Sequence, residues 1–311
     1  MKVGISSPIV ALAGHRPAWE AAAGTAELVR VAQAADRLGY EYMTCGDHVA
    51  VPPGLPRGER FYDPLATFSF LAGQTRRLRF MPYVLVLPFY HPLEIAKRYG
   101  TLDHLSGGRL ILAFGVGNLK EEFDMLGVPF DDRGPRADDA LRALRAALSG
   151  RKVSYDGPYY SFQDMVVDPH AAQPRVPMWI GGHSERALRR AVTLADGWAP
   201  APQAFRGPTP ELMRQMLDRH DLPEGFDVVF SPGKALDPTE ESGLVTEVIA
   251  SAEKAGATRI NLTVRHESLA HYLEQLEAFA EIAGLDIQLD QAADPKVVAV
   301  TSDHRKATSQ A

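Results

Sequence analysis

An aspartate and a histidine, Asp47 and His48, stand directly after a short apolar run at 42–45. An imidazole exchanges protons near neutral pH, so His48 can give a proton to a substrate oxygen or take one from it. The neighbouring Asp47 either takes part in this transfer or caps the loop that begins there. The alternative for His48 is an ordinary histidine whose hydrogen bonds are met by its neighbours. We expect Asp47 and His48 to be the catalytic pair.

A second candidate site is Gly181-Gly182-His183-Ser184, which separates an apolar run from a segment of helical periodicity. Backbone N–H groups at the start of a helix point outward at the positive end of its dipole, where phosphate groups bind. A plain strand-to-helix turn with Ser184 as the N-cap would use the same residues. The late position of these residues in a chain of alternating strands and helices favours phosphate binding.

Two other classes of site are disfavoured. Gly115-Val116-Gly117 resembles the start of a dinucleotide-binding fingerprint, but Lys120 stands where that fingerprint has its third glycine. The segment also follows the fourth strand, whereas the fingerprint follows the first. The histidines show no metal-ligand spacing such as HxH or HExxH, so we expect no metal.

The elements that must position these residues alternate between apolar runs and segments of helical periodicity. The expected strands are 3–6, 42–45, 78–85, 109–114, 177–180, 197–200, 226–230 and 258–264. The expected helices are 20–38, 64–75, one that opens at Pro92, 136–149, 184–195, 209–219, 242–255 and 268–283. Asp156-Gly157 predicts a hairpin turn within 152–176, an insertion after the fourth strand–helix unit. Eight such units favour a closed (β/α)8 barrel over an open doubly wound sheet.

A barrel of this kind brings the candidate residues together, because catalytic groups lie where its strands end. The residues at these ends form one group from five strands. They are Ser6, Asp47 and His48, Tyr83 and Val84, Gly117 and Asn118, and the sequence 181–184.

The composition is that of a soluble globular protein, with 45% hydrophobic and 23% charged residues among 311. A single cysteine, Cys45, allows no internal disulfide, and the apolar runs are too short for a signal peptide or a membrane span. We therefore expect a cytoplasmic protein. The net charge of −6 argues against nucleic acid and favours a small-molecule substrate. We expect one barrel domain over 1–285 and a polar tail over 286–311 that is irregular or acts as a docking arm.

Five segments resemble the luciferase-like monooxygenase superfamily, and they are most similar to its branch that uses the deazaflavin coenzyme F420. The segments cover nearly the whole expected barrel. They are GDHVAVP at 46–52, YDPLATF at 62–68, VLVLPFYHPLEIAKRYGTLDHLSGGRL at 84–110, FGVGNLKEEFDMLGVPFDDRG at 114–134 and PMWIGGHSERALRRAVTLADGW at 177–198.

The resemblance implies a position for each candidate residue around a bound cofactor. In similar proteins, the pair matching Asp47 and His48 lies beside the reactive ring. A bulge after the third strand, often with a non-prolyl cis peptide, backs the ring, and the matching bond is Tyr83-Val84. Ser6 is expected to contact the cofactor from the first strand.

The same resemblance places the remaining residues. The sequence 181–184 corresponds to the phosphate site of the cofactor, and Gly117 and Asn118 flank the edge of its ring system. Relatives that oxidise sugar phosphates carry a glutamate as proton donor where this chain has Asn118. An amide cannot titrate, which argues against that particular activity here.

The expected function is hydride transfer between F420 and a small organic substrate. The first alternative keeps the fold and uses FMN with O2, as a monooxygenase fed by a separate reductase. Others are a catalytically silent flavin-binding protein and a metal-dependent hydrolase. Arg57, Arg60 and Lys120 are candidates for holding the anionic tail of F420, and the loop 49–62 and the hairpin are expected to form a lid. The resemblance also implies a homodimer.

Overall fold

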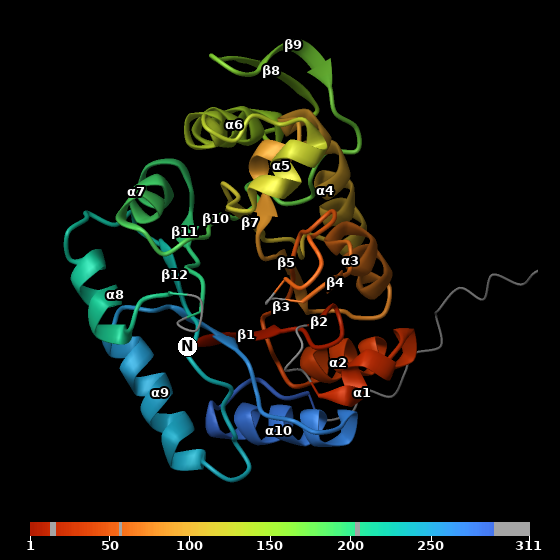
Figure 1. Ribbon diagram of the computed structural model, residues 1–311, viewed down its shortest axis with the longest axis vertical. Coiled ribbons are helices and arrows are strands. Elements are labelled where there is room, and N and C mark those ends of the chain that lie inside the picture. The colour runs from red at the N-terminus through yellow and green to blue at the C-terminus, as the bar shows by residue number, and fades with distance from the viewer. Residues whose placement is uncertain (13–16, 56–57, 203–205, 289–311) are drawn as a thin grey trace, which may run out of the picture.

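Parallel strands close into the predicted (β/α)8 barrel (Figure 1). The computed structural model describes residues 1–12, 17–55, 58–202 and 206–288. The strands are β1 (Lys2–Ser6), β3 (Tyr42–Cys45), β5 (Arg79–Pro82), β6 (Leu85–Val86), β7 (Leu112–Gly115), β10 (Met178–Ile180), β11 (Gly197–Trp198), β12 (Asp227–Phe230) and β13 (Arg259–Leu262). They are bonded in the order β5-β3-β1-β13-β12-β11-β10-β7-β6. A parallel bridge between Phe80 of β5 and Leu110, which precedes β7, closes the strands into a ring.

Helices surround the barrel on its outer side (Figure 1). They are α1 (Ala18–Ala22), α2 (Thr25–Arg37), α3 (Pro64–Ala72), the 3-10 helix η1 (Leu87–Phe89), α4 (Pro92–Ser106), α5 (Lys120–Leu126), α6 (Arg133–Ala147), α7 (Glu185–Leu194), α8 (Pro210–Leu217), α9 (Ser242–Lys254) and α10 (Leu269–Ile282). Side-chain caps explain several of the starts. The Asp63 carboxylate accepts from the Ala66 N–H at 2.6 Å, with Pro64 in the first turn, as the sequence predicts.

Several elements differ from the predicted ones, and three of the differences affect the site. The third expected strand is divided into β5 and β6, because the chain bulges at Tyr83-Val84, where the peptide bond is cis as the resemblance implies. The first expected helix is two helices, and Glu27 caps the second by accepting from the Gly24 N–H at 2.9 Å. Helix α5 was not predicted, and it follows directly on the fourth strand's loop.

Successive side chains of a strand point to opposite faces of the sheet, and they form two apolar clusters. One cluster lies between the strands and the helices, and it includes Val3 and Ile5 of β1. The other fills the barrel interior with Tyr42, Met81, Ile111, Ala113, Trp179, Ala199 and Val229. At the amino ends of the strands, the Arg259 guanidinium donates to Glu41 at 2.6 Å and lies 5.0 Å from the Trp179 ring centre. That end is therefore filled, and a ligand has to enter at the carboxyl ends of the strands.

The predicted hairpin is present as β8 (Lys152–Asp156) and β9 (Ser161–Val166), between α6 and β10. The Tyr155 hydroxyl donates to the Asp139 carboxylate of α6 at 2.6 Å. Of the expected tail, residues 286–288 contact the end of α2, where the Gln288 N–H donates to the Arg37 carbonyl at 3.0 Å. Residues 289–311 lie outside the described chain. Among the described helices, none combines the length and the apolar character that crossing a membrane requires.

Candidate functional site

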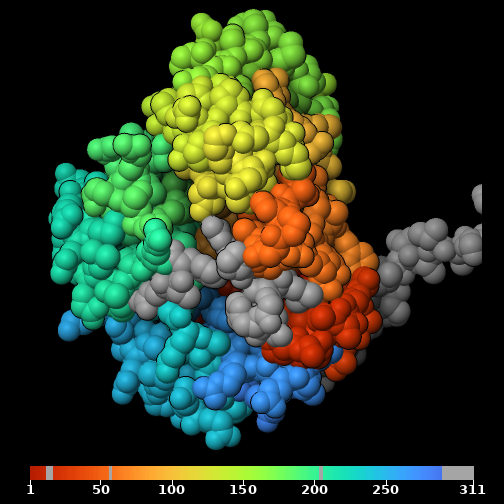
Figure 2. Space-filling view, in the orientation of Figure 1, coloured from red at the N-terminus to blue at the C-terminus, as the bar shows by residue number. Residues whose placement is uncertain are grey.

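His48 forms a dyad with Glu122, a residue that the sequence analysis missed. His48 Nδ1 lies 2.9 Å from one Glu122 carboxylate oxygen, and the Val49 N–H donates to the other at 3.0 Å. Glu122 belongs to the first turn of α5, and its side chain is 1% exposed. Figure 2 shows the yellow surface of the α5 region beside the orange surface of the segment that follows β3. Two elements far apart in sequence thus hold one imidazole.

The dyad fixes which ring nitrogen of His48 is available. A carboxylate only accepts hydrogen bonds, so Nδ1 carries a proton and donates a hydrogen bond to Glu122. Within the described chain, Nε2 of His48 has no hydrogen-bond partner. The Phe61 ring lies 4.4 Å from the imidazole, between centroids, and limits how the imidazole can turn. Nε2 is therefore presented to a substrate as a proton donor or acceptor.

Asp47 is buried and bonded to the segment behind the bulge. Its carboxylate accepts from the Val86 N–H at 3.1 Å and from the Tyr90 hydroxyl at 2.9 Å. Burial raises the pKa of Asp47 to about 6, although the Tyr90 hydroxyl and the Val86 N–H each lower it. These bonds tie the loop after β3 to β6 and to the start of α4.

Asp47 should make stability depend on pH. Its folded-state pKa lies above the unfolded value of about 3.9, so the folded protein binds this proton more tightly. The contribution to stability is present below pH ~4 and is lost as pH rises through about 6. Asp47→Asn keeps both bonds if Tyr90 accepts from the amide. We expect its free energy of unfolding, relative to wild type, to rise by about 1–3 kcal/mol between pH 4.5 and pH 8. Urea unfolding at both pH values measures this change, and a constant difference would contradict the prediction.

The bulge at Tyr83 and Val84 explains two of the glycines at the strand ends. A Cβ on Gly115 would lie 2.6 Å from Val84 Cγ2, and one on Gly181 would lie 2.6 Å from Val84 Cγ1. The Tyr83 hydroxyl donates to the Ala199 carbonyl at 3.2 Å and also contacts the Pro200 carbonyl. Burial raises the pKa of Tyr83 well above its ordinary value. Glycine at 115 and 181 thus leaves room for the Val84 side chain to pack against the ends of β7 and β10.

The predicted site residues after the fourth strand, Gly117 and Asn118, and at the end of the first strand, Ser6, differ in their surroundings. Gly117 has a φ of +78°, and a Cβ there would lie 2.5 Å from the Phe123 ring. Its carbonyl accepts from Arg133 Nε at 3.2 Å, so Gly117 turns the chain into the helix that carries Glu122. Asn118 is exposed. The Ser6 hydroxyl accepts from the Asn261 amide at 3.0 Å at the end of β1.

The sequence 181–184 forms the predicted start of a helix, with Ser184 as its N-cap. Ser184 caps α7, because its hydroxyl accepts from the Ala187 N–H at 3.2 Å. Gly182 has a φ of +89°, and its carbonyl accepts from Trp198 Nε1 at 2.9 Å. Residues 182–184 are exposed, and their backbone N–H groups donate to no other group of the described residues. They are thus free to bind an anion.

The expectation that Arg60 would hold an anionic cofactor tail is wrong. Its guanidinium donates to the backbone carbonyls of Ile9 at 2.9 Å, Glu20 at 2.7 Å and Ala21 at 3.1 Å, and is therefore committed to the fold. Lys120 is paired with Asp124 on the surface of α5. Arg57 lies outside the described residues.

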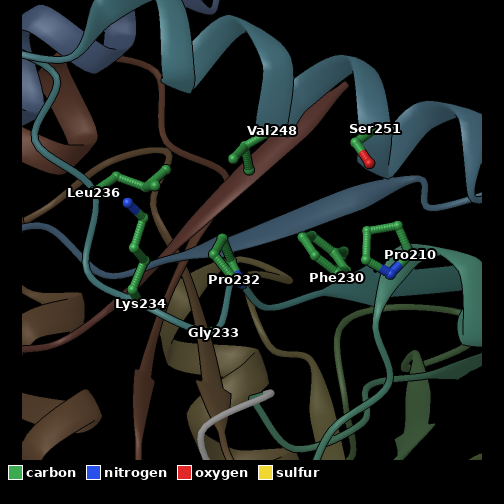
Figure 3. A pocket seen from close by; sticks show the side chains of 8 residues that line it. All are labelled: Pro210, Phe230, Pro232, Gly233, Lys234, Leu236, Val248 and Ser251. Atoms are coloured by element: carbon green, nitrogen blue, oxygen red, sulfur yellow. The ribbon is translucent and has the colours of Figure 1, made fainter.

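An apolar cavity of about 540 Å³ lies beside β12 (Figure 3). Val248 and Ser251 reach into it from α9, opposite the loop that carries Lys234 (Figure 3). Its other lining residues are Pro210, Phe230, Pro232, Gly233 and Leu236. The cavity includes none of the predicted site residues. Across the described part of the chain, no three His, Cys, Asp or Glu side chains gather in a way that could hold a metal ion.

The βα barrel thus carries a histidine–carboxylate dyad and a bulged third strand at its open end. The sequence profile of the luciferase-like monooxygenase family matches residues 1–244, and the chain belongs to this family.

Two relatives illustrate the match. An uncharacterised protein of Mycobacterium tuberculosis (strain ATCC 25618 / H37Rv) is 35% identical over 184 residues, which make up 55% of this chain and 63% of that protein. The F420-dependent glucose-6-phosphate dehydrogenase of Microbacterium testaceum (strain StLB037) is 28% identical over 221 residues, 70% of this chain and 62% of that enzyme. The chain thus spans less than two thirds of the length of each relative.

Solved structures share the fold. An F420-dependent secondary alcohol dehydrogenase, in complex with an F420–acetone adduct, superposes with a TM-score of 0.70 at 14% identity over 90% of this chain and 97% of the other. The oxygenating constituent of 3,6-diketocamphane monooxygenase from Pseudomonas putida, in complex with FMN, gives 0.67 at 15% identity over 93% and 99%. At these identities the likeness establishes the fold alone.

Proposed function

We propose that this chain is an oxidoreductase that uses coenzyme F420 and transfers hydride between the cofactor and a small organic substrate. The observation that carries the proposal is the His48–Glu122 dyad at the open end of the barrel, with a free Nε2. The cofactor, when bound, supplies the ring that gives or receives the hydride. The protein supplies binding, orientation and the proton.

The residues at the open end fit a flat ring that carries a phosphate. Val84 offers an apolar surface, and Gly115 and Gly181 leave the ends of their strands without side chains. The free N–H groups of residues 182–184 at the start of α7 suit a phosphate. Ser6 ends β1, and Gly117 follows the end of β7. We assign these residues, with Tyr83 and Asn118, to cofactor binding.

His48 is assigned the proton transfer. Glu122 holds Nδ1 as a donor, and Nε2 gives a proton to a substrate oxygen or takes one from it. Asp47 takes a positioning role in this proposal, because its carboxylate is bonded to Val86 and Tyr90. Asn118 is exposed and cannot titrate, which favours an alcohol, carbonyl or unsaturated substrate over a sugar phosphate.

The dehydrogenase relative favours F420, since its name assigns that cofactor to a protein 28% identical to this chain. The alternative is a monooxygenase that uses FMN and O2 with a separate reductase, and the FMN-bound barrel motivates it. The silent flavin-binding alternative has less support because the dyad is complete. The proposal includes a cytoplasmic homodimer, by family resemblance and from the single cysteine.

Titrating the apoprotein with F420 and with FMN tests the proposal. We expect F420 to bind at least about tenfold more tightly, a difference of about 1.4 kcal/mol. Fluorescence quenching gives both dissociation constants. Tighter binding of FMN would replace the proposal with the monooxygenase alternative, and binding of neither would contradict both.

A further inference from the structure

A second buried histidine–carboxylate pair joins the first and last loops of the barrel. His266 Nε2 lies 2.8 Å from a Glu20 carboxylate oxygen, and His266 Nδ1 lies 2.9 Å from the Val264 carbonyl. The side chains are 4% and 0% exposed. Glu20 belongs to α1, which follows the β1 loop, and His266 follows β13. This pair is separate from the His48–Glu122 dyad.

The other Glu20 oxygen holds the loop after β1 in an unusual conformation. It accepts from the Ile9 N–H at 2.9 Å. Ile9 is fully buried with a φ of +74°, a left-handed conformation that β-branched residues rarely adopt without support from their surroundings. Arg60 completes that support by donating to the Ile9 carbonyl at 2.9 Å.

The loop is connected in turn to His48. Strands β2 (Ala11–Leu12) and β4 (Arg60–Phe61) pair antiparallel and form what we call the β2–β4 ribbon. The Tyr62 N–H donates to the Val10 carbonyl at 2.9 Å, beside the same ribbon. Phe61 of this ribbon lies 4.4 Å from the His48 ring. A continuous set of contacts therefore runs from His266 through Glu20, Ile9 and the ribbon to the imidazole of the proposed catalytic dyad.

The bonds of the pair do not depend on a second proton on His266. Both ring nitrogens of His266 face acceptors, the Glu20 carboxylate at Nε2 and the Val264 carbonyl at Nδ1. A neutral ring with its proton on Nε2 still donates to the carboxylate and gives up only the bond to the Val264 carbonyl. Other groups that face the pair include the Trp19 and Tyr272 rings, at 5.6 and 4.9 Å from His266, and the Arg60 guanidinium at the Glu20 carbonyl.

We propose that Glu20 and His266 are positioning residues for His48: a brace that holds the β1 loop and the β2–β4 ribbon against the dyad. The brace itself is independent of the proposed function. Its consequence for turnover rests on that function, in which His48 transfers a proton.

Glu20→Gln is the conservative variant. The amide oxygen can still accept from the Ile9 N–H, and the amide N–H can donate to Nε2 of a neutral His266. This variant therefore keeps the brace when His266 is neutral. Glu20→Leu removes both hydrogen bonds of the brace. Glu277→Gln, at an exposed pair with Arg37, is the matched control.

The first measurement is amide hydrogen exchange of the apoprotein at pH 9, on peptides that contain Ile9 and Tyr62, expressed as protection factors. Protection should be similar in wild type, Glu277→Gln and Glu20→Gln, and low in Glu20→Leu. Circular dichroism melting checks that each variant is folded. Unchanged protection in a folded Glu20→Leu, or protection in Glu20→Gln as low as in Glu20→Leu, would overturn the brace.

The second measurement tests the connection to His48. In the apoprotein, histidine NMR should show the His48 ring signals of Glu20→Leu broadened or displaced, while those of Glu20→Gln at high pH match wild type. With cofactor and substrate, kcat of Glu20→Leu should fall about 10–10²-fold, the scale of a 1 Å misplacement. Unchanged His48 signals would overturn the positioning role. Failure to bind F420 or FMN would instead contradict the proposed function and leave the exchange and NMR results decisive for the brace.

Discussion

His48→Ala is expected to lower kcat about 10²–10⁴-fold, the range that general acid–base catalysis contributes. The imidazole is the group at the open end whose Nε2 has no partner within the described chain, while its Nδ1 is held 2.9 Å from Glu122. Removing the ring leaves the barrel, the bulge and the start of α7 in place. Cofactor affinity should therefore change by less than about threefold, or less than 1 kcal/mol.

The measurement combines steady-state turnover with a cofactor titration of the same preparation. His104→Ala is the matched control, because His104 is exposed on α4 and away from the dyad. It should leave both kcat and cofactor affinity unchanged. A His48→Ala enzyme with wild-type turnover would remove His48 from the mechanism, whereas loss of cofactor binding would give the ring a binding role instead.

The fold could be predicted because its signals are local. Each strand that is buried on both faces is a short apolar run, and caps such as Asp63 and Ser184 mark where helices begin. Periodicity does not mark the break in the third strand, since apolar residues stand on both sides of it, Phe80 and Met81 before and Leu85 and Val86 after. The break depends on the packing of Val84 against Gly115 and Gly181, which are distant from it in sequence. The position of the Tyr83-Val84 bulge was predicted from the resemblance to relatives and not from periodicity.

The site was predicted less completely, because its key contact joins loops that sequence spacing cannot relate. Glu122 and the exposed Glu121 are adjacent and identical in type, and only the packing of α5 decides which is buried. The available signal for Glu122 was its position beside the apolar Phe123, within the segment 114–134 that resembles the family. Arg60 failed for the same reason: its loop position indicated a free cation, but three backbone carbonyls occupy it.

Glu122→Gln should have the second largest effect, because it reverses the hydrogen bond that sets the His48 tautomer. The amide oxygen can accept from the Val49 N–H, which leaves the amide N–H facing His48 Nδ1. Nδ1 then has to accept, and the proton of the neutral ring moves to Nε2. A neutral ring in this tautomer cannot take a proton at the free nitrogen. We expect kcat to fall at least about 10²-fold, as the wrong tautomer does in histidine-dependent hydrolases, with little change in KM.

Two further variants separate the tautomer from the other effects of the substitution. Glu121→Gln changes the exposed neighbour in the same way and should leave kcat unchanged. Glu122→Ala removes both bonds and leaves the Val49 N–H without its partner, so it should lose kcat and also stability, by about 1–3 kcal/mol. Nitrogen-15 NMR of the His48 ring in the apoprotein reports the tautomer directly. If Glu122→Gln shows the changed tautomer but keeps its turnover, His48 acts as a donor from Nε2, because a donor needs the proton that this variant places there.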